Sequence, residues 1–143
     1  SNATNIRDNK NNQEQIKSNK KAMGYKQSGG YSNGTLISKL KEQKYLEIDS
    51  DRDAKYLSYV LKRDKLDKKY VGIHGFDNRY YLVEKSLFKS LRLEVLSILN
   101  EQMGANDISK KLNKNLNLIK GVLTILLEEG EIIGKRKGIY IAI

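Results

Sequence analysis

The chain has 143 residues, 38% of them hydrophobic, so it can bury the core of one ordinary domain or of two very small ones. It holds 27 lysines and arginines against 17 aspartates and glutamates, and this formal net charge of +10 favours a polyanionic partner such as nucleic acid. The absence of cysteine excludes disulfides and thiolate metal sites, and one histidine cannot form a histidine cluster. We therefore expect neither a metal nor another cofactor.

The positive charge is spread along the chain. Residues 1–34 carry six cations and two acids, residues 35–84 carry eleven and nine, and residues 85–143 carry ten and six. A lysine-rich composition alone would give much of this excess, so the placement of the cations decides what they do. No apolar run approaches the roughly 18 residues of a membrane span, and no signal peptide is recognisable, so we expect a cytoplasmic protein without membrane contact.

The first segment, residues 1–34, is rich in Asn, Lys, Gln, Ser and Gly, and its first three residues look like the remnant of an expression tag. Such a composition cannot bury enough apolar surface to offset the entropy of ordering. We expect a disordered basic arm here, with a short helix near residues 13–23 as an alternative.

Residues 35–84 are expected to form a helix-helix-hairpin unit. Apolar residues at helical spacing predict one amphipathic helix in TLISKLKEQKYLEI, residues 35–48, and a stronger one in DSDRDAKYLSYVLKRDKL, residues 49–66, capped by Asp49 or Ser50. The following run changes to a period of two, with a Gly-Phe-Asp-Asn turn between the apolar stretches 70–73 and 80–83. That pattern predicts a hairpin, whose tyrosines either pack or stack on bases.

Residues 85–143 predict three helices followed by a hairpin. The first covers residues 86–102 and is closed by Met103 and Gly104, and a short second helix starts with Asn106 as its cap. A turn at 113–115 leads into a third helix that ends at Gly130. The final hairpin holds Lys135, Arg136 and Lys137 at its tip between two glycines. The order loosely repeats that of residues 35–84.

The stretch ISKKLNKNLNLIKGVLTILLEEGEIIGKRKG resembles the winged helix-turn-helix superfamily of DNA-binding domains. The resemblance depends on the charged hairpin and on apolar residues of the second and third helices, namely Ile108, Leu112, Ile119, Leu123 and Leu126, with Ile132 after the terminating Gly130. It covers residues 86–143 well and residues 35–84 weakly. The expected fold is therefore mostly α with small β-hairpins, an α+β fold with two winged-helix-like units in tandem: a degenerate one at 35–84 and a winged helix-turn-helix domain at 85–143.

This resemblance implies a non-enzymatic protein that binds double-stranded DNA, with the third helix in the major groove and the basic wing on the phosphate backbone. Tandem units of this kind are familiar in replication initiators, so transcription regulation and the replication or partition of a mobile element are the expected settings. The residues that would contact DNA are Lys114, Asn115, Asn117, Lys120, Thr124, Lys135, Arg136 and Lys137.

The third helix is apolar over more of its circumference than one core-facing stripe needs. Leu118, Val122 and Ile125 form a second apolar strip, which must be covered by the first half of the chain, by a second copy in a homodimer, or by another protein. If that cover hides the groove-facing side, backbone binding by the wing remains. The runner-up function is accordingly a protein-interaction scaffold with this strip as its interface.

An enzyme is the least expected function. His74 has no nucleophile or second base at a recognisable spacing, so we interpret it as a structural or surface residue, and no small-molecule substrate is evident.

Overall fold

The computed structural model describes residues 33–136 and 138–143. The basic arm and the alternative helix near residues 13–23 lie outside this part, although Asn33 and Gly34, expected in the arm, begin the first helix. The described residues form an α+β fold with five helices and two antiparallel sheets of three strands each. Residues Ile37–Ile143 make up one compact unit, and the contacts described below lie within it.

The first half contains α1 (Asn33–Gln43), β1 (Tyr45–Ile48), α2 (Asp51–Arg63), the 3₁₀ turn η3 (Asp67–Lys69), β2 (Tyr70–His74) and β3 (Tyr80–Glu84). The second half contains α3 (Lys85–Ile98), β4 (Met103–Gly104), α4 (Ala105–Leu112), α5 (Leu116–Glu128), β5 (Ile132–Arg136) and β6 (Ile139–Ala142). Both predicted hairpins are confirmed, as β2–β3 and β5–β6.

The prediction of one helix over residues 35–48 is wrong for the last part of this range. The chain leaves the helix at Lys44, which has a left-handed φ of 71°, and the next four residues pair with β3 as strand β1. Leu46 and Ile48 are buried while Tyr45 and Glu47 are half-buried, which is the period of two of a strand. Ser50 caps α2, as one of the two predicted alternatives, because its hydroxyl accepts a hydrogen bond from the Asp53 N–H at 3.2 Å.

Two boundaries in the second half also differ from the prediction. α3 ends at Ile98, and Met103 and Gly104 do not close a helix but pair with β6 as strand β4. As a result α4 starts two residues earlier than predicted, with Gly104 rather than Asn106 as its N-cap. The turn before α5 is confirmed: Asn113 takes the left-handed conformation, with φ 56°, and Asn115 caps α5.

The two sheets have the same strand order, β1-β3-β2 and β4-β6-β5. In each half, the strand before the last helix pairs with the second strand of the hairpin. The halves differ in two elements: α4 has no counterpart between β1 and α2, which only Asp49 and Ser50 connect, and η3 has no counterpart between α5 and β5. The loose repetition in the sequence is therefore matched by a repeated topology.

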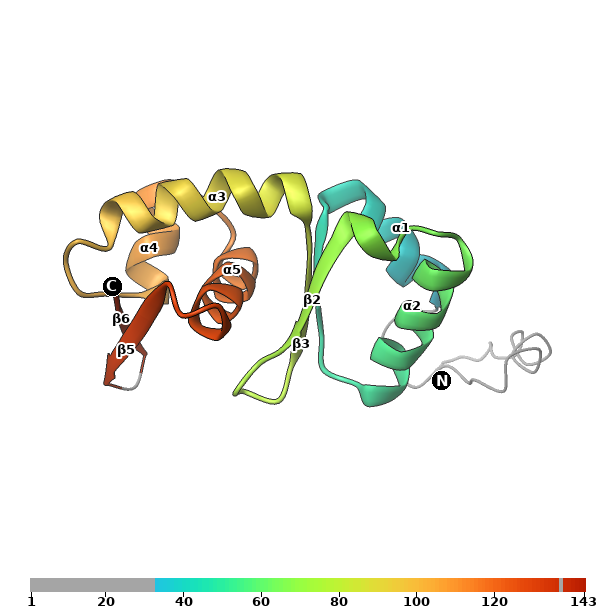
Figure 1. Ribbon diagram of the computed structural model, residues 1–143. Coiled ribbons are helices and arrows are strands. Elements are labelled where there is room, and N and C mark those ends of the chain that lie inside the picture. The colour runs from blue at the N-terminus through green and yellow to red at the C-terminus, as the bar shows by residue number, and fades with distance from the viewer. Residues whose placement is uncertain (1–32, 137) are drawn as a thin grey trace, which may run out of the picture. The chain divides into compact units, whose positions relative to one another are not determined.

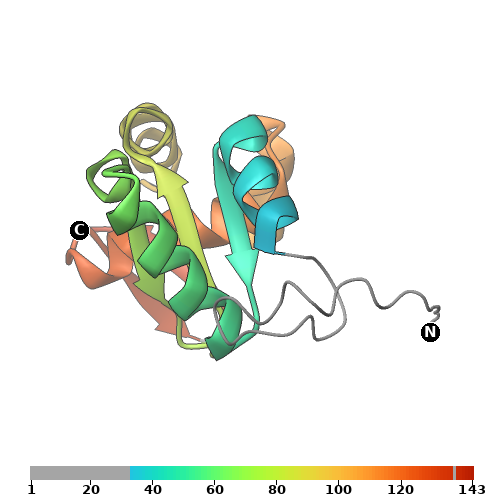
Figure 2. The ribbon, with the colours of Figure 1, turned by 90° about the vertical axis from the view of Figure 1, so that its right-hand side faces the viewer.

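The sheet of the first half has helices on both faces. α2 lies in front of β2 and β3 in Figure 2, and α5 lies beside the same strands in Figure 1. α5 contacts all three strands, and its Gly121 lies so close that a Cβ there would be 3.3 Å from Tyr81. Val83 belongs to the same buried cluster as α3, α4 and α5, and Val71 and Ile73 pack against that cluster. One core therefore joins the two halves.

Candidate nucleic-acid interface

The β5–β6 hairpin presents exposed cations. Lys135 and Arg136 are both exposed, and Lys137 lies outside the described residues. The register shifts between Gly134 and Arg136, which places Lys135 in a bulge and interrupts the strict alternation of side chains between the two faces. Gly138 has a φ of 78°, a conformation that glycine adopts without strain, and so closes the turn tightly.

No ion pair within the described part of the chain includes Lys135 or Arg136. The carboxylate at the base of this hairpin, Glu131, is held by Arg92 of α3, which donates from Nε at 2.9 Å and also from Nη2. These hydrogen bonds lower the pKa of Glu131. The acid is thereby neutralised near the base, and the cations at the tip remain available to an external anion.

The first hairpin is different because Arg79 in its turn and Lys69 just before its first strand are both paired with acids. Arg79 bonds to Glu47 at 2.9 Å, and Lys69 lies 3.7 Å from Glu84. The turn itself carries Asp77, whose carboxylate accepts hydrogen bonds from the Arg79 N–H at 3.1 Å and from the Tyr81 hydroxyl at 2.5 Å. A carboxylate at the tip repels phosphate, so this hairpin is a poor second wing.

The tyrosines of the first hairpin are engaged within the chain. Tyr81 is 2% and Tyr70 is 6% exposed, so neither ring is available for stacking on bases. Tyr80 donates its hydroxyl to Asp51 at 2.6 Å, and His74 stacks on its ring with centroids 4.2 Å apart. His74 is therefore an exposed residue with a packing partner, which agrees with its interpretation as a structural or surface residue.

The end of α4 and the turn that follows it add further cations, since Lys110 and Lys111 of α4 and Lys114 of the turn are all exposed. Asn115, expected to contact DNA, uses its side-chain oxygen inside the turn. Oδ1 accepts the backbone N–H of Asn117 at 2.8 Å and that of Leu118 at 3.4 Å. The cap occupies this acceptor, so only the amide NH₂ of Asn115 remains for another partner.

Replacing Asn115 by alanine is expected to lower the free energy of unfolding by about 0.5–2 kcal/mol, because two N–H groups of α5 lose their acceptor. Asn115→Asp should keep most of the stability, since a carboxylate accepts the same two hydrogen bonds. Urea unfolding followed by circular dichroism measures both variants. Equal stability of the alanine variant and the unchanged chain would contradict this capping role.

The exposed edge of α5 is narrow. Asn117 is exposed, Lys120 and Thr124 are half-buried, and the Thr124 hydroxyl donates to the Lys120 carbonyl at 2.7 Å. The second apolar strip is covered within the chain: Leu118, Val122 and Ile125 are 6%, 0% and 2% exposed, respectively, and belong to the cluster that includes Val83.

Of the three covers considered for this strip, the first half of the chain supplies it, so the strip is not free to serve as an interface. A helix that reads the major groove presents a whole face to the bases. The sheet of the first half lies against α5, which leaves only the edge described above.

In comparisons with protein-family models, with curated proteins and with solved structures, no significant match to the chain was found. Among residues 33–136 and 138–143, no helix is both long and apolar enough to cross a membrane. The same residues contain no group of three or more His, Asp or Glu side chains arranged to hold a metal ion.

Proposed function

We propose that the chain is a non-enzymatic DNA-binding protein of the cytoplasm, built from two winged-helix-like units in tandem. The proposal depends on one observation above all: Lys135 and Arg136 stand exposed on a tight hairpin turn, with no acid paired to them. The repeated strand order of the two sheets supports the tandem arrangement. Transcription regulation and the replication or partition of a mobile element remain the proposed settings.

The mode of binding that we propose is contact with the phosphate backbone. The wing residues Lys135, Arg136 and Lys137 pair with phosphates, and Lys114 and Lys120 add contacts from the start of α5. Asn117 and Thr124 lie on the same exposed edge and contribute polar contacts. Since the sheet of the first half covers most of α5, we propose only shallow contact of this helix with the groove rather than full insertion.

Backbone contact predicts binding with little sequence preference. Duplexes of unrelated sequence and equal length should bind with dissociation constants within a few-fold of one another, because phosphates carry no base identity. Fluorescence anisotropy with labelled duplexes at a fixed salt concentration measures this. A duplex bound about 10³-fold more tightly than the others would show specific base contacts. That result would contradict the backbone mode, whereas absence of binding to every duplex would contradict the DNA-binding function itself.

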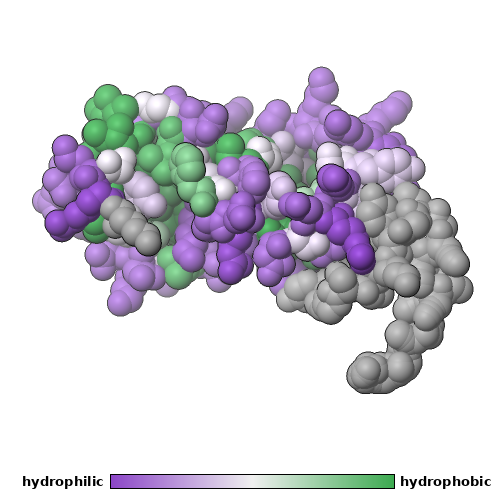
Figure 3. All heavy atoms as spheres, turned by 90° about the horizontal axis from the view of Figure 1, so that it is seen from below, coloured by the Kyte–Doolittle hydropathy of each residue, from purple (hydrophilic) through white to green (hydrophobic). Residues whose placement is uncertain are grey.

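A second candidate function is self-association through the β4-β6-β5 sheet, on the face that points away from the core. Tyr140 and Ala142 of β6 pack on the core, so the alternate residues Ile139 and Ile141 lie on the opposite face. Ile141 pairs across the strands with Ile133, which is 44% exposed. Figure 3 shows an apolar area next to the hydrophilic side chains at this end of the molecule. Such a face fits the corresponding face of a second copy in a homodimer.

The double change Ile133→Lys and Ile141→Lys is expected to abolish this self-association, because it places like charges on both copies of the apolar face. Sedimentation equilibrium over a range of protein concentrations measures the molecular mass of the variant and of the unchanged chain. A monomeric unchanged chain at all concentrations would exclude the homodimer, and a dimeric double variant would place its interface elsewhere.

A further inference from the structure

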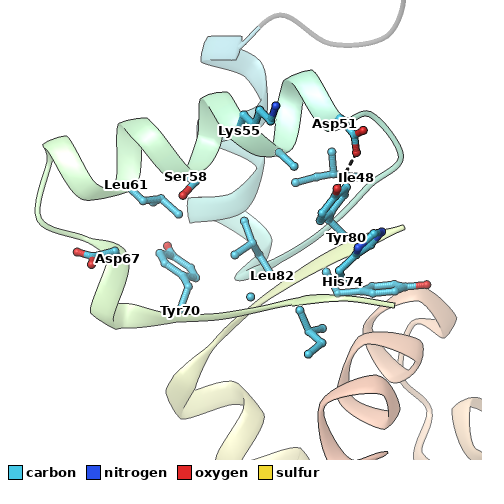
Figure 4. Close-up of a pocket in the computed structure, with 14 residues that line it drawn as sticks. Ile48, Asp51, Lys55, Ser58, Leu61, Asp67, Tyr70, His74, Tyr80 and Leu82 are labelled. Carbon is cyan, nitrogen blue, oxygen red and sulfur yellow. Dashed lines mark hydrogen bonds between the residues drawn. The ribbon is translucent and has the colours of Figure 1, made fainter. Parts of the chain in front are cut away.

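A groove of about 430 Å³ lies between α2 and the face of the first sheet that points away from α5. This volume is within the range of small-molecule sites. Gly72 and Leu82, which are partners across β2 and β3, line its sheet side. α2 lines the opposite side with Ala54, Ser58 and Leu61, as Figure 4 shows for the labelled residues.

Gly72 keeps the groove open. A Cβ at this position would be 3.1 Å from the Cδ2 atom of Leu82, so any side chain would crowd the sheet side of the groove. Glycine within a strand weakens it, and it often marks a place where another group approaches the backbone closely. A larger residue at position 72 would therefore fill part of the groove.

Tyr70 places a buried hydroxyl in the groove. The residue is 6% exposed, and its ring extends from β2 toward α2, with the hydroxyl near Ser58 and Leu61 in Figure 4. Within the described residues this hydroxyl forms no hydrogen bond. Burial, followed by the Glu84 carboxylate, raises the pKa of Tyr70, so the hydroxyl keeps its proton as a donor. This donor points into a space large enough for a ligand, and an acceptor atom on that ligand would pair with it in place of water.

The rim of the groove disfavours an anion. It carries two carboxylates, Asp51 and Asp67, against the single ammonium group of Lys55. At one end the stacked rings of His74 and Tyr80 provide a flat aromatic wall. An aromatic wall and apolar sides favour a flat, apolar ligand without negative charge.

We propose that this groove binds a small, flat, uncharged and largely apolar molecule, with a carbonyl or similar oxygen that accepts a hydrogen bond from the Tyr70 hydroxyl. The site is separate from the exposed cations of the β5–β6 turn and does not depend on DNA binding. Ser58 lies on the α2 side, where its hydroxyl can serve the same polar end of the molecule.

The test is a ¹H–¹⁵N NMR titration of the full chain with two probes of the same shape, 1-indanone and indane, which differ in a carbonyl oxygen. Probes of this size should bind with dissociation constants of about 0.1–10 mM. We expect shift changes at the amides of Gly72, Leu82 and Ser58, and about two- to tenfold tighter binding of 1-indanone. No shift changes at these amides, or changes confined to other regions, would overturn the proposal.

Three variants make the test specific. Tyr70→Phe should leave the affinity for indane unchanged and lower the affinity for 1-indanone to the same value. Tyr59→Phe, on the exposed part of α2, should change neither affinity. Gly72→Val and Ala54→Leu fill the groove from opposite sides, and each should abolish the binding of both probes. The amide spectrum away from the groove reports whether each variant folds. A preference for 1-indanone that survives in Tyr70→Phe, or binding that survives both filling variants, would refute the proposed site.

Discussion

Gly121→Leu is expected to lower the free energy of unfolding by roughly 1–3 kcal/mol, because the new side chain has no space between α5 and β3. A Cβ alone would be 3.3 Å from both Cβ and Cδ1 of Tyr81 and 3.4 Å from Cγ2 of Val83. The higher helix propensity of leucine offsets part of this loss, by less than about 1 kcal/mol. Urea unfolding measures the difference.

Asn117→Leu is the matched control, because Asn117 is exposed on the same helix. This change should alter stability by no more than about 0.5 kcal/mol. If α5 instead presented Gly121 to solvent, as a helix in a major groove does before binding, Gly121→Leu would stabilise the chain by up to about 1 kcal/mol. The sign of the effect therefore distinguishes a covered helix from an exposed one.

The helices with strong local signals could be predicted from the sequence. α2 has a capping serine and acids in its first turn, and α5 lies between the capping Asn115 and Gly130, which has a φ of 75°. The hairpins follow from apolar runs around Gly-containing turns. These features are set by residues close in sequence, which is why periodicity and capping suffice to find them.

The strands β1 and β4 could not be found in the same way. Each is short, four and two residues respectively, and each exists only because a distant hairpin strand pairs with it. Residues 35–48 have apolar positions that fit a helix, and the break at Lys44 depends on a positive φ that is uncommon for lysine. Pairing over a long sequence separation decided the structure here, against the local pattern.

The candidate site shows the same division between local and distant effects. The exposed cationic turn follows from the glycines and cations adjacent in sequence, and the width of the apolar surface on α5 indicates that a second element covers it. The identity of the covering element, here the sheet of the first half, depends on tertiary packing and could not be predicted from the sequence. The pairing of Arg79 with Glu47, 32 residues away, and the groove beside Gly72 are also products of packing, although a glycine within a strand was a signal for the groove.

Changing Lys135 and Arg136 together to alanine is expected to weaken DNA binding for all sequences and to flatten its salt dependence. Each lost phosphate contact reduces the slope of log K against log salt concentration by about 0.9, so two contacts reduce it by about 1.8. Adding Lys137→Ala should bring the reduction to about 2.7. Anisotropy titrations of a labelled duplex at several salt concentrations between about 50 and 200 mM measure the slope.

The matched control is the double change Lys62→Ala and Lys68→Ala, which removes the same charge from exposed positions in the first half. If binding depends on overall charge alone, both double variants lose affinity equally and share one slope. If the β5–β6 turn is the wing, only the Lys135 and Arg136 variant shows the flattened slope, because counterions are released only where phosphates are contacted. An unchanged slope in that variant would remove the hairpin from the interface and leave DNA binding without its main contact.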